Sequence, residues 1–359
     1  MAGKFLWIMA AVLLSVQLLH YGAARALVWW LGVSRRPVLW TVFLIGNTII
    51  LLSSLRLMLS PRWVAAWLAL LWFACLSAGA VLLLNQFAFR HHPQRRRVLR
   101  IAAAAVFLAL PAWSVYHAYV PVVRHISITL DKPLTKPLRI GMAADTHWGV
   151  LAGKRQIRTL AQIMQREQAD VILMPGDIMD DNTAAYEAEN MHSELLNLRA
   201  PLGVYATLGN HDLFGHQQQI TQALQRAGIR VLNDEAVLLD GRVWVAGRPD
   251  KLDSQRLPTE RLLAQTNAKQ PIILLDHRPD DAEAHAQMPI DIQLSGHVHN
   301  GQVFPLNLLV RALNRIHYGY ERINQTHFVV TSGYGFWGVP LRLGSQAEVW
   351  IIDVNGKQP

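Results

Sequence analysis

Acidic residues are missing from the first third of this chain. Residues 1–124 contain 12 lysines and arginines but no aspartate or glutamate, whereas residues 125–359 carry 22 basic and all 25 acidic residues. Two regions of different chemistry therefore join near residue 124. The net charge of +9 comes entirely from the first region, which excludes a basic nucleic-acid-binding chain, and 52% hydrophobic residues exclude a disordered one.

Cysteine is almost absent, with Cys75 as the only one, and it lies within an apolar run. A single cysteine excludes an intramolecular disulfide framework and a cysteine-rich metal site. It does not decide the redox compartment, because a domain without cysteine suits either side of a membrane.

Four long apolar segments predict a membrane domain over residues 1–124. A spanning helix needs about 20 mostly apolar residues, and the candidate spans are about 5–27, 38–59, 63–89 and 98–120. Tryptophans lie near the segment ends, as aromatic belts predict. A cleavable signal peptide is the alternative for the first segment, because Ala24-Arg25-Ala26 resembles a cleavage site. The charge at Arg25 and the spans that follow favour a retained helix.

The basic residues predict the orientation. Eight of them lie in or beside the loops that follow spans one and three, including Arg90, Arg95 and Arg97, and four lie on the other side. The positive-inside rule then places residues 125–359 on the extracytoplasmic side of a cell (inner) membrane. One miscounted span would reverse this orientation.

Residues 125–359 predict a layered α/β domain, with β-sheets flanked by helices. Expected buried strands are 138–144, 171–174, 204–208, 272–275 and 290–294, expected helices are 154–168, 184–198, 217–227 and 259–267, and 235–246 is an expected hairpin turning at Asp240-Gly241. Residues 121–137 combine a short strand with prolines, which suits an exit from the membrane.

Metal-binding residue types follow each of the five expected strands. They occur in the sequences Asp145-Thr146-His147, Gly176-Asp177, Gly209-Asn210-His211-Asp212, Asp276-His277 and Gly296-His297-Val298-His299. Ligands of α/β sheets bind beyond the carboxyl ends of strands, so we expect these side chains at one sheet edge. Each motif alone has an ordinary explanation as a helix cap, a turn or a core histidine. Together they are typical of a site for Mn, Fe, Zn or Mg.

These five motifs, in this order, resemble the calcineurin-like metallophosphoesterase superfamily over residues 138–353. The segment 296–302, followed by 333–342, is similar to its membrane-associated bacterial subgroup. Asn300 stands where that subgroup commonly has glycine, which affects the loop but removes no ligand. Trp148, just past the first motif, is expected to narrow or line the pocket.

The resemblance implies two divalent metal ions. Asp145, His147 and His299 would hold one, Asn210, His277 and His297 would hold the other, and Asp177 would bridge them. His211 would be the catalytic residue that protonates the leaving alkoxide or stabilises the transition state, and Asp212 would orient its imidazole and hold it protonated. The alternative for Asp212 is a cap on the following segment. We assign no chemistry to Asp180, Asp181, Asp276 or His216.

The implied activity is that of a membrane-anchored enzyme that hydrolyses phosphodiester bonds by attack of metal-bound hydroxide. Location at the bilayer, rather than the resemblance, suggests lipid-linked phosphates as its substrates. A nucleotide-lipid pyrophosphatase of the UDP-diacylglucosamine hydrolase type is an alternative, but it needs a cytoplasmic domain and so conflicts with the predicted orientation. A catalytically silent receptor or scaffold is a second alternative, and the intact set of ligands argues against it. A transporter is disfavoured because the spans hold few ionisable groups.

The amphipathic segment Phe304–Tyr320 follows the last ligand motif. We expect it to be a lid or packing helix, and contact with the membrane interface is the alternative.

Overall fold

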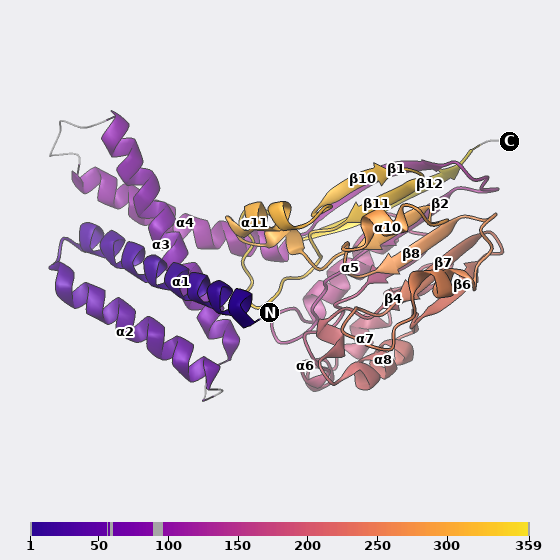
Figure 1. Cartoon of the computed structure of the whole chain (residues 1–359), viewed down its shortest axis with the longest axis horizontal. Helices are drawn as coiled ribbons and strands as arrows, with labels where there is room; N and C mark the ends of the chain where they lie inside the picture. The colour runs from indigo at the N-terminus through magenta and orange to yellow at the C-terminus, as the bar shows by residue number, and fades with distance from the viewer. Residues whose placement is uncertain (1, 56, 58–59, 89–95, 358–359) are drawn as a thin grey trace. The chain divides into compact units, whose positions relative to one another are not determined.

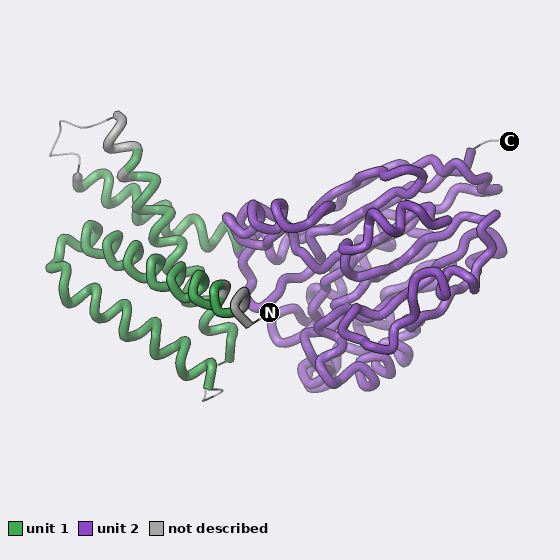
Figure 2. The backbone as a smooth tube through the Cα atoms, in the orientation of Figure 1, with its two compact units in different colours: residues 1–114 green, residues 115–359 purple. Residues whose placement is uncertain are grey.

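The computed structural model describes residues 2–55, 57, 60–88 and 96–357. Its contacts divide the chain into two compact units, residues 1–114 and 115–359 (Figure 2). The boundary thus falls within the fourth apolar helix, so the last turn of that helix belongs to the second unit. The division at residue 124 that charge suggests stays a prediction.

The first unit consists of apolar helices, and the four predicted ones are confirmed. They are α1 (Ala2–Leu31), α2 (Arg35–Ser54), α3 (Pro61–Ala88) and α4 (Arg96–Tyr119), and each is long and apolar enough to cross a membrane. The predicted ends at residues 59 and 89, and Arg56, Arg90 and Arg95, lie outside the described residues.

Small side chains contribute to the buried contacts between the helices of this unit, and many large apolar ones are exposed. Ala23, Ala24 and Ala74 are buried where α1, α2 and α3 meet, whereas Trp40 and Leu44 are exposed. Close contact between helices through small residues and an apolar outer surface suit a lipid environment.

The second unit contains two six-stranded sheets (Figure 1). The first has the order β1 (Val122–Leu130), β12 (Glu348–Gly356), β2 (Leu138–Met142), β3 (Val171–Pro175), β4 (Val204–Thr207) and β5 (Ile229–Val231). The second has the order β10 (Gly319–Ile323), β11 (Thr326–Val330), β9 (Ile292–Ser295), β8 (Ile272–Asp276), β7 (Val243–Arg248) and β6 (Glu235–Leu239). The neighbours β2, β3, β4 and β5 run parallel, as do β11, β9, β8 and β7.

Apolar clusters show how the layers stack. One cluster joins inward residues of both sheets, such as Ile140 and Leu173 from the first and Ile273 and Leu294 from the second. Another covers the outer face of the first sheet with α5 (Lys154–Arg166), α7 (His192–Leu195) and α8 (Gln217–Arg226). The outer face of the second sheet packs against α9 (Thr259–Leu263) and α10 (Ala282–His285). The layered α/β fold is therefore confirmed as two facing sheets between helices.

Two local expectations need correction. The helix expected over 184–198 is two short helices, α6 (Ala184–Ala188) and α7, because Asn190, at φ 50°, adopts a left-handed conformation that ends the first one. The five ligand-bearing strands lie in two sheets rather than along the edge of one. The hairpin at Asp240-Gly241 is confirmed by the antiparallel pairing of β6 with β7.

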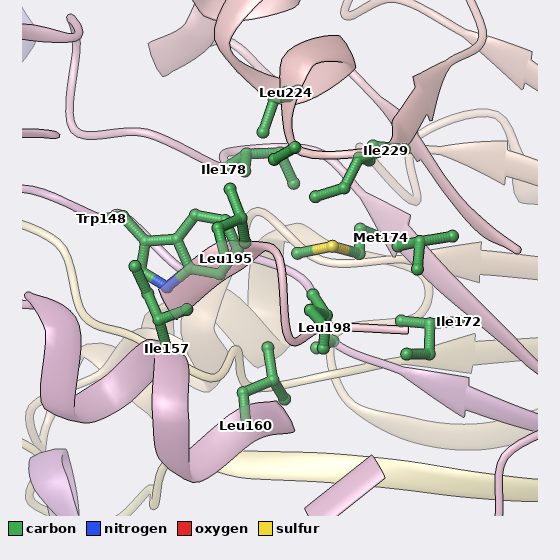
Figure 3. Packing of buried hydrophobic residues seen from close by; sticks show 14 of the residues in the cluster. Trp148, Ile157, Leu160, Ile172, Met174, Ile178, Leu195, Leu198, Leu224 and Ile229 are labelled. Atoms are coloured by element: carbon green, nitrogen blue, oxygen red, sulfur yellow. The ribbon is translucent and has the colours of Figure 1, made fainter. Parts of the chain in front are cut away.

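Trp148 does not line a pocket, contrary to expectation. Its side chain is fully buried in the cluster under α5, and Figure 3 shows its ring among Ile157, Ile178 and Leu195. The backbone N–H of Trp148 donates to the carbonyl of Ile178 at 2.9 Å, which extends the pairing of β2 with β3 beyond both strands. The loop therefore directs the neighbouring His147 toward the candidate site and Trp148 into the core.

Candidate metal centre

The candidate site lies beyond the carboxyl ends of the central strands of both sheets. The loops after β2, β3 and β4 bring residues from the first sheet, and those after β8 and β9 bring residues from the second. Because β3 and β8 pack against each other across the core, all five loops meet.

The first three predicted ligands form one buried group. Asp145, His147 and His299 offer donor atoms that all lie within 4.8 Å of one another. The Nε2 atoms of His147 and His299 are 3.3 Å apart, and Nε2 of His299 is 3.5 Å from Oδ1 of Asp145. Two imidazole nitrogens and a carboxylate oxygen facing one point are a donor set that suits a divalent cation.

A second group lies beside the first. Asp177, His277 and His297 offer donor atoms within 4.8 Å of one another, and Oδ1 of Asn210 is 3.2 Å from Nε2 of His277. The Nδ1 of His277 donates to the carbonyl of Pro175 at 2.9 Å, which leaves Nε2 directed at the site. The structure thus brings all seven predicted ligands together.

Asp177 joins the two groups. Its Oδ2 is 3.2 Å from Nε2 of His277 in the second group and 3.7 Å from Nε2 of His147 in the first. Its Oδ1 accepts a 2.9 Å hydrogen bond from the backbone N–H of His211, which fixes the carboxylate plane. One oxygen atom therefore faces both groups, as a bridging carboxylate would.

The backbone around the ligands is strained. Asp145, His147, Asp177, His297 and His299 all have φ between 43° and 71°. A left-handed conformation is costly for residues with a Cβ, at about 1–3 kcal/mol each, and such strain gathers at functional sites. Asn300, at φ 47°, also lies in this region. Asparagine tolerates this left-handed conformation better than most residues. Asn300 can therefore occupy the position at which the related subgroup has glycine.

Two glycines leave room for the carboxylates. A Cβ at Gly209 would lie 2.1 Å from Oδ1 of Asp177, and one at Gly296 would lie 2.2 Å from Oδ2 of Asp145. Both glycines belong to the five motifs. Their role is to let the backbone approach a ligand carboxylate more closely than a residue with a Cβ could.

Burial and charge give the ligands different protonation tendencies. Burial lowers the pKa of His147 to about 3 and, together with the neighbouring His277 and Arg278, lowers that of His297 to about 3. Both imidazoles are therefore neutral, with a lone pair to share. Burial disfavours a charged His277, but the Asp177 carboxylate prevails and raises its pKa to about 10. At neutral pH His277 therefore carries a proton, and with it a positive charge, next to Asp177. A metal cation bound there would supply this positive charge in place of the proton on His277.

His211 lies beside the first group without belonging to it. Its ring centroid is 4.9 Å from that of His147, and its Nδ1 contacts Oδ1 of Asp181 at 2.5 Å. This hydrogen bond, acting against burial, raises the pKa of His211 above its usual value. Asp181, for which the sequence pattern predicts no chemistry, is therefore the carboxylate that orients His211. Only the fold reveals it, since the two residues lie on different loops.

The orienting role predicted for Asp212 is wrong. Its buried carboxylate accepts hydrogen bonds from the backbone N–H groups of Ile178 (3.1 Å), Met179 (2.9 Å) and Gly209 (2.9 Å). It therefore ties the loop after β3 to the loop after β4. It does not cap the following segment either, because its partners precede it in the chain.

Two arginines contact the histidines of the last motif, and the sequence pattern predicts no role for either of them, although Arg342 ends the segment 333–342 that carries the resemblance. Arg278 contacts Nε2 of His297 at 2.9 Å and is itself held by Asp250. Arg342 is fully buried, donates to the carbonyls of Ser332 and Gly335, and lies 3.3 Å from Nδ1 of His299.

A third cluster of metal-binding residue types has a different explanation. Asp276, Asp281 and His285 also gather their donor atoms. However, Arg248 lies 3.3 Å and Arg256 lies 3.7 Å from Asp276, so guanidinium groups already balance its carboxylate. This cluster is an ion-pair network beside the site.

Comparisons with known proteins agree with this geometry. The family model described as calcineurin-like phosphoesterase matches residues 138–301. An uncharacterized metallophosphoesterase of Aquifex aeolicus is 30% identical over 261 residues, covering 70% of this chain and 98% of that protein. One from Helicobacter pylori is 32% identical over 241 residues, covering 64% of this chain and 62% of that protein, which is less than two thirds of its length. A zebrafish (Danio rerio) transmembrane protein with metallophosphoesterase domain is 28% identical over 323 residues, covering 80% of this chain and 73% of that protein.

Proposed function

Because the chain belongs to the calcineurin-like phosphoesterase family, we propose that it is a membrane-anchored, metal-dependent hydrolase of phosphodiester bonds, lipid-linked ones among them. The observation that carries this proposal is the shared Oδ2 of Asp177, which faces two buried groups of nitrogen and oxygen donors. Receptors and scaffolds have no need of such a paired donor set.

The donors divide between two divalent metal ions as the sequence predicts. Asp145, His147 and His299 would hold one ion, and Asn210, His277 and His297 would hold the other, with Asp177 between them. His147 also has a buried Nδ1 without a hydrogen-bond partner among the described residues. Bound cations would neutralise the phosphate oxygens and activate water as the nucleophile.

His211 would act on the leaving group. Its raised pKa favours the protonated imidazole, and its side chain is partly exposed at the site. Asp181 holds Nδ1, so Nε2 is the nitrogen that can donate a proton to the departing alkoxide.

The surroundings of His211 favour a diester over a monoester. Its ring lies 5.1 Å from that of Phe214 and 6.3 Å from that of Trp337, and both aromatic side chains are about half exposed. An aromatic rim suits the organic group on the leaving side of a diester.

The anchoring helices make this a membrane protein, and we propose that its catalytic unit lies on the extracytoplasmic side of the inner membrane. The support is the uneven distribution of basic residues around the spans, in which Arg35, Arg36 and Arg97 lie on one side. An alkaline-phosphatase reporter fused after Pro359 should be active. An inactive fusion, with an active cytoplasmic reporter at the same position, would reverse the orientation.

Turnover by the purified full chain in detergent tests the activity. With Mn²⁺ added, we expect hydrolysis of an aryl phosphodiester to exceed that of an aryl monophosphate, and we expect Asp177→Asn to abolish it. His211→Ala should lower kcat while the metal content stays unchanged. Absence of metal-dependent turnover, or equal turnover by Asp177→Asn, would overturn the proposal in favour of a silent receptor or scaffold.

A further inference from the structure

Helix α11 (Leu306–Leu313) exposes apolar side chains that nothing in the described chain covers. Leu306, Leu308, Leu309 and Leu313 are 52%, 56%, 53% and 73% exposed, and no residue of the helix is buried. A single exposed leucine is ordinary, but four on one short helix form a patch that is typical of a binding surface.

The end of the fourth membrane helix is fixed inside the same unit. The carbonyl of His117 accepts a 2.9 Å hydrogen bond from the backbone of Ala347, and the hydroxyl of Tyr119 donates to the carbonyl of Leu151 at 3.0 Å. The rings of Tyr119 and Phe336 are in edge contact at 5.3 Å. Because α4 is a candidate span that ends at Tyr119, the residues that contact its last turn would lie at the membrane surface.

A short chain of contacts leads from this turn to α11. The carbonyl of Ser345 contacts Nδ1 of His117 at 3.3 Å, and the hydroxyl of Ser345 donates to the carbonyl of Gln302 at 3.0 Å. Gly301 packs so closely under Asn307 that an added Cβ would lie 2.2 Å from its backbone nitrogen. These contacts connect the last turn of α4 to the start of α11.

We propose that α11, Leu151 and Trp337 together dock on the bilayer from which α4 emerges, and we name them the lipid-facing surface. The occupant is the lipid itself because this surface continues from the end of a membrane span. Its charge also fits, since segments 296–320 and 333–346 contain no aspartate or glutamate and α11 carries the exposed Arg311. An apolar face with basic residues and no acids suits a membrane with anionic lipids.

The lipid-facing surface reaches the candidate metal centre through Trp337. Its backbone N–H donates to Oε1 of Gln302 at 2.8 Å, next to the start of α11, and its ring faces His211. Resting on the proposed function, this continuity means that a phosphodiester carried by a membrane lipid reaches His211 without leaving the bilayer surface. The substrate class is therefore a lipid with a phosphodiester headgroup.

Lipid-borne quenchers test the docking in the full chain. In a Cys75→Ala background, one environment-sensitive dye is attached at Leu309→Cys and, as the matched control, at Leu238→Cys. Leu238 is exposed on β6 next to the hairpin at Asp240, at the end of the sheet away from the metal centre. After reconstitution in vesicles of phosphatidylcholine and phosphatidylglycerol, quencher-labelled lipids should quench the dye at 309 and not at 238.

Equal weak quenching at both positions would overturn the docking proposal. If the dye at 309 is shielded from lipid and also responds to dilution of the protein in the vesicles, a second copy covers α11 and the proposal is wrong. Loss of quenching when phosphatidylglycerol is omitted would assign the attraction to Arg311 and the acid-free segments and would support the proposal.

Turnover on two substrates tests the consequence. For the double variant Leu309→Gln, Leu313→Gln, we expect unchanged hydrolysis of a water-soluble aryl phosphodiester and about tenfold slower hydrolysis of a phosphodiester lipid in the same vesicles. Equal rates on the lipid for variant and wild type would overturn the proposed route. If the wild type hydrolyses neither substrate, the proposed function fails, and the quenching experiment still decides whether α11 docks.

Discussion

Replacing Asp212 with alanine separates an anchoring carboxylate from a catalytic one. The carboxylate accepts hydrogen bonds from three buried backbone N–H groups, those of Ile178, Met179 and Gly209. Leaving a buried donor unsatisfied costs about 1–3 kcal/mol, so three of them together cost about 3–6 kcal/mol after partial relaxation. For a domain of this size each kcal/mol shifts Tm by about 2–4 °C. We therefore expect Asp212→Ala to lower the Tm of the catalytic unit by about 6–24 °C.

The matched variant is Asp181→Ala. This carboxylate is half exposed and contacts Nδ1 of His211, so its loss should change Tm by no more than about 2 °C. It should lower kcat by about tenfold to a hundredfold because the imidazole of His211 loses its fixed orientation. Circular dichroism during heating and turnover of an aryl phosphodiester, both on the full chain in detergent, measure the two effects. A normal Tm with a low kcat for Asp212→Ala, together with an unchanged kcat for Asp181→Ala, would refute this reasoning.

Three further perturbations follow from the geometry. Gly296→Ala places a Cβ 2.2 Å from Oδ2 of Asp145, so metal titration should show about tenfold to a hundredfold weaker binding. Gly79→Ala, where a Cβ meets nothing within 4 Å, is the control and should bind metal normally. Chelation should lower Tm, because Asp145 and Asp177 then lose their cations, and saturating Mn²⁺ at about 1,000 times Kd should restore about 4 kcal/mol; a Tm indifferent to both treatments would contradict the site. Trp148→Ala should destabilise the core by about 3–5 kcal/mol and leave KM unchanged. A large change in KM would indicate that Trp148 lines the pocket after all.

The sequence predicted the candidate site best where metal-binding residue types directly follow a strand. The five buried strands were recognisable as apolar runs, and the carboxyl end of a parallel strand has a fixed relation to its sheet. Asp145, Asp177 and His277 were therefore placed at the site without knowledge of which sheet carried them. The division into two facing sheets was not predictable from local patterns, because the first sheet is completed by β12, which pairs with the distant β1 and β2.

Side-chain direction within the loops was the part that local patterns did not reveal. Asp212 follows His211 directly, and adjacency suggested a contact, but the short 3₁₀ turn at His211–Leu213 directs the two side chains to different partners. Trp148 likewise follows a ligand, His147, whose left-handed backbone sends the next side chain into the core. Directions of this kind depend on tertiary contacts rather than on residue order.

Anomalous scattering from crystals of the full chain grown with Mn²⁺ tests the central claim most directly. Two peaks should appear, one against Asp145, His147 and His299 and the other against Asn210, His277 and His297, with the carboxylate of Asp177 touching both. A single peak, no peak, or a peak only at Asp276, Asp281 and His285 would contradict the paired metal centre.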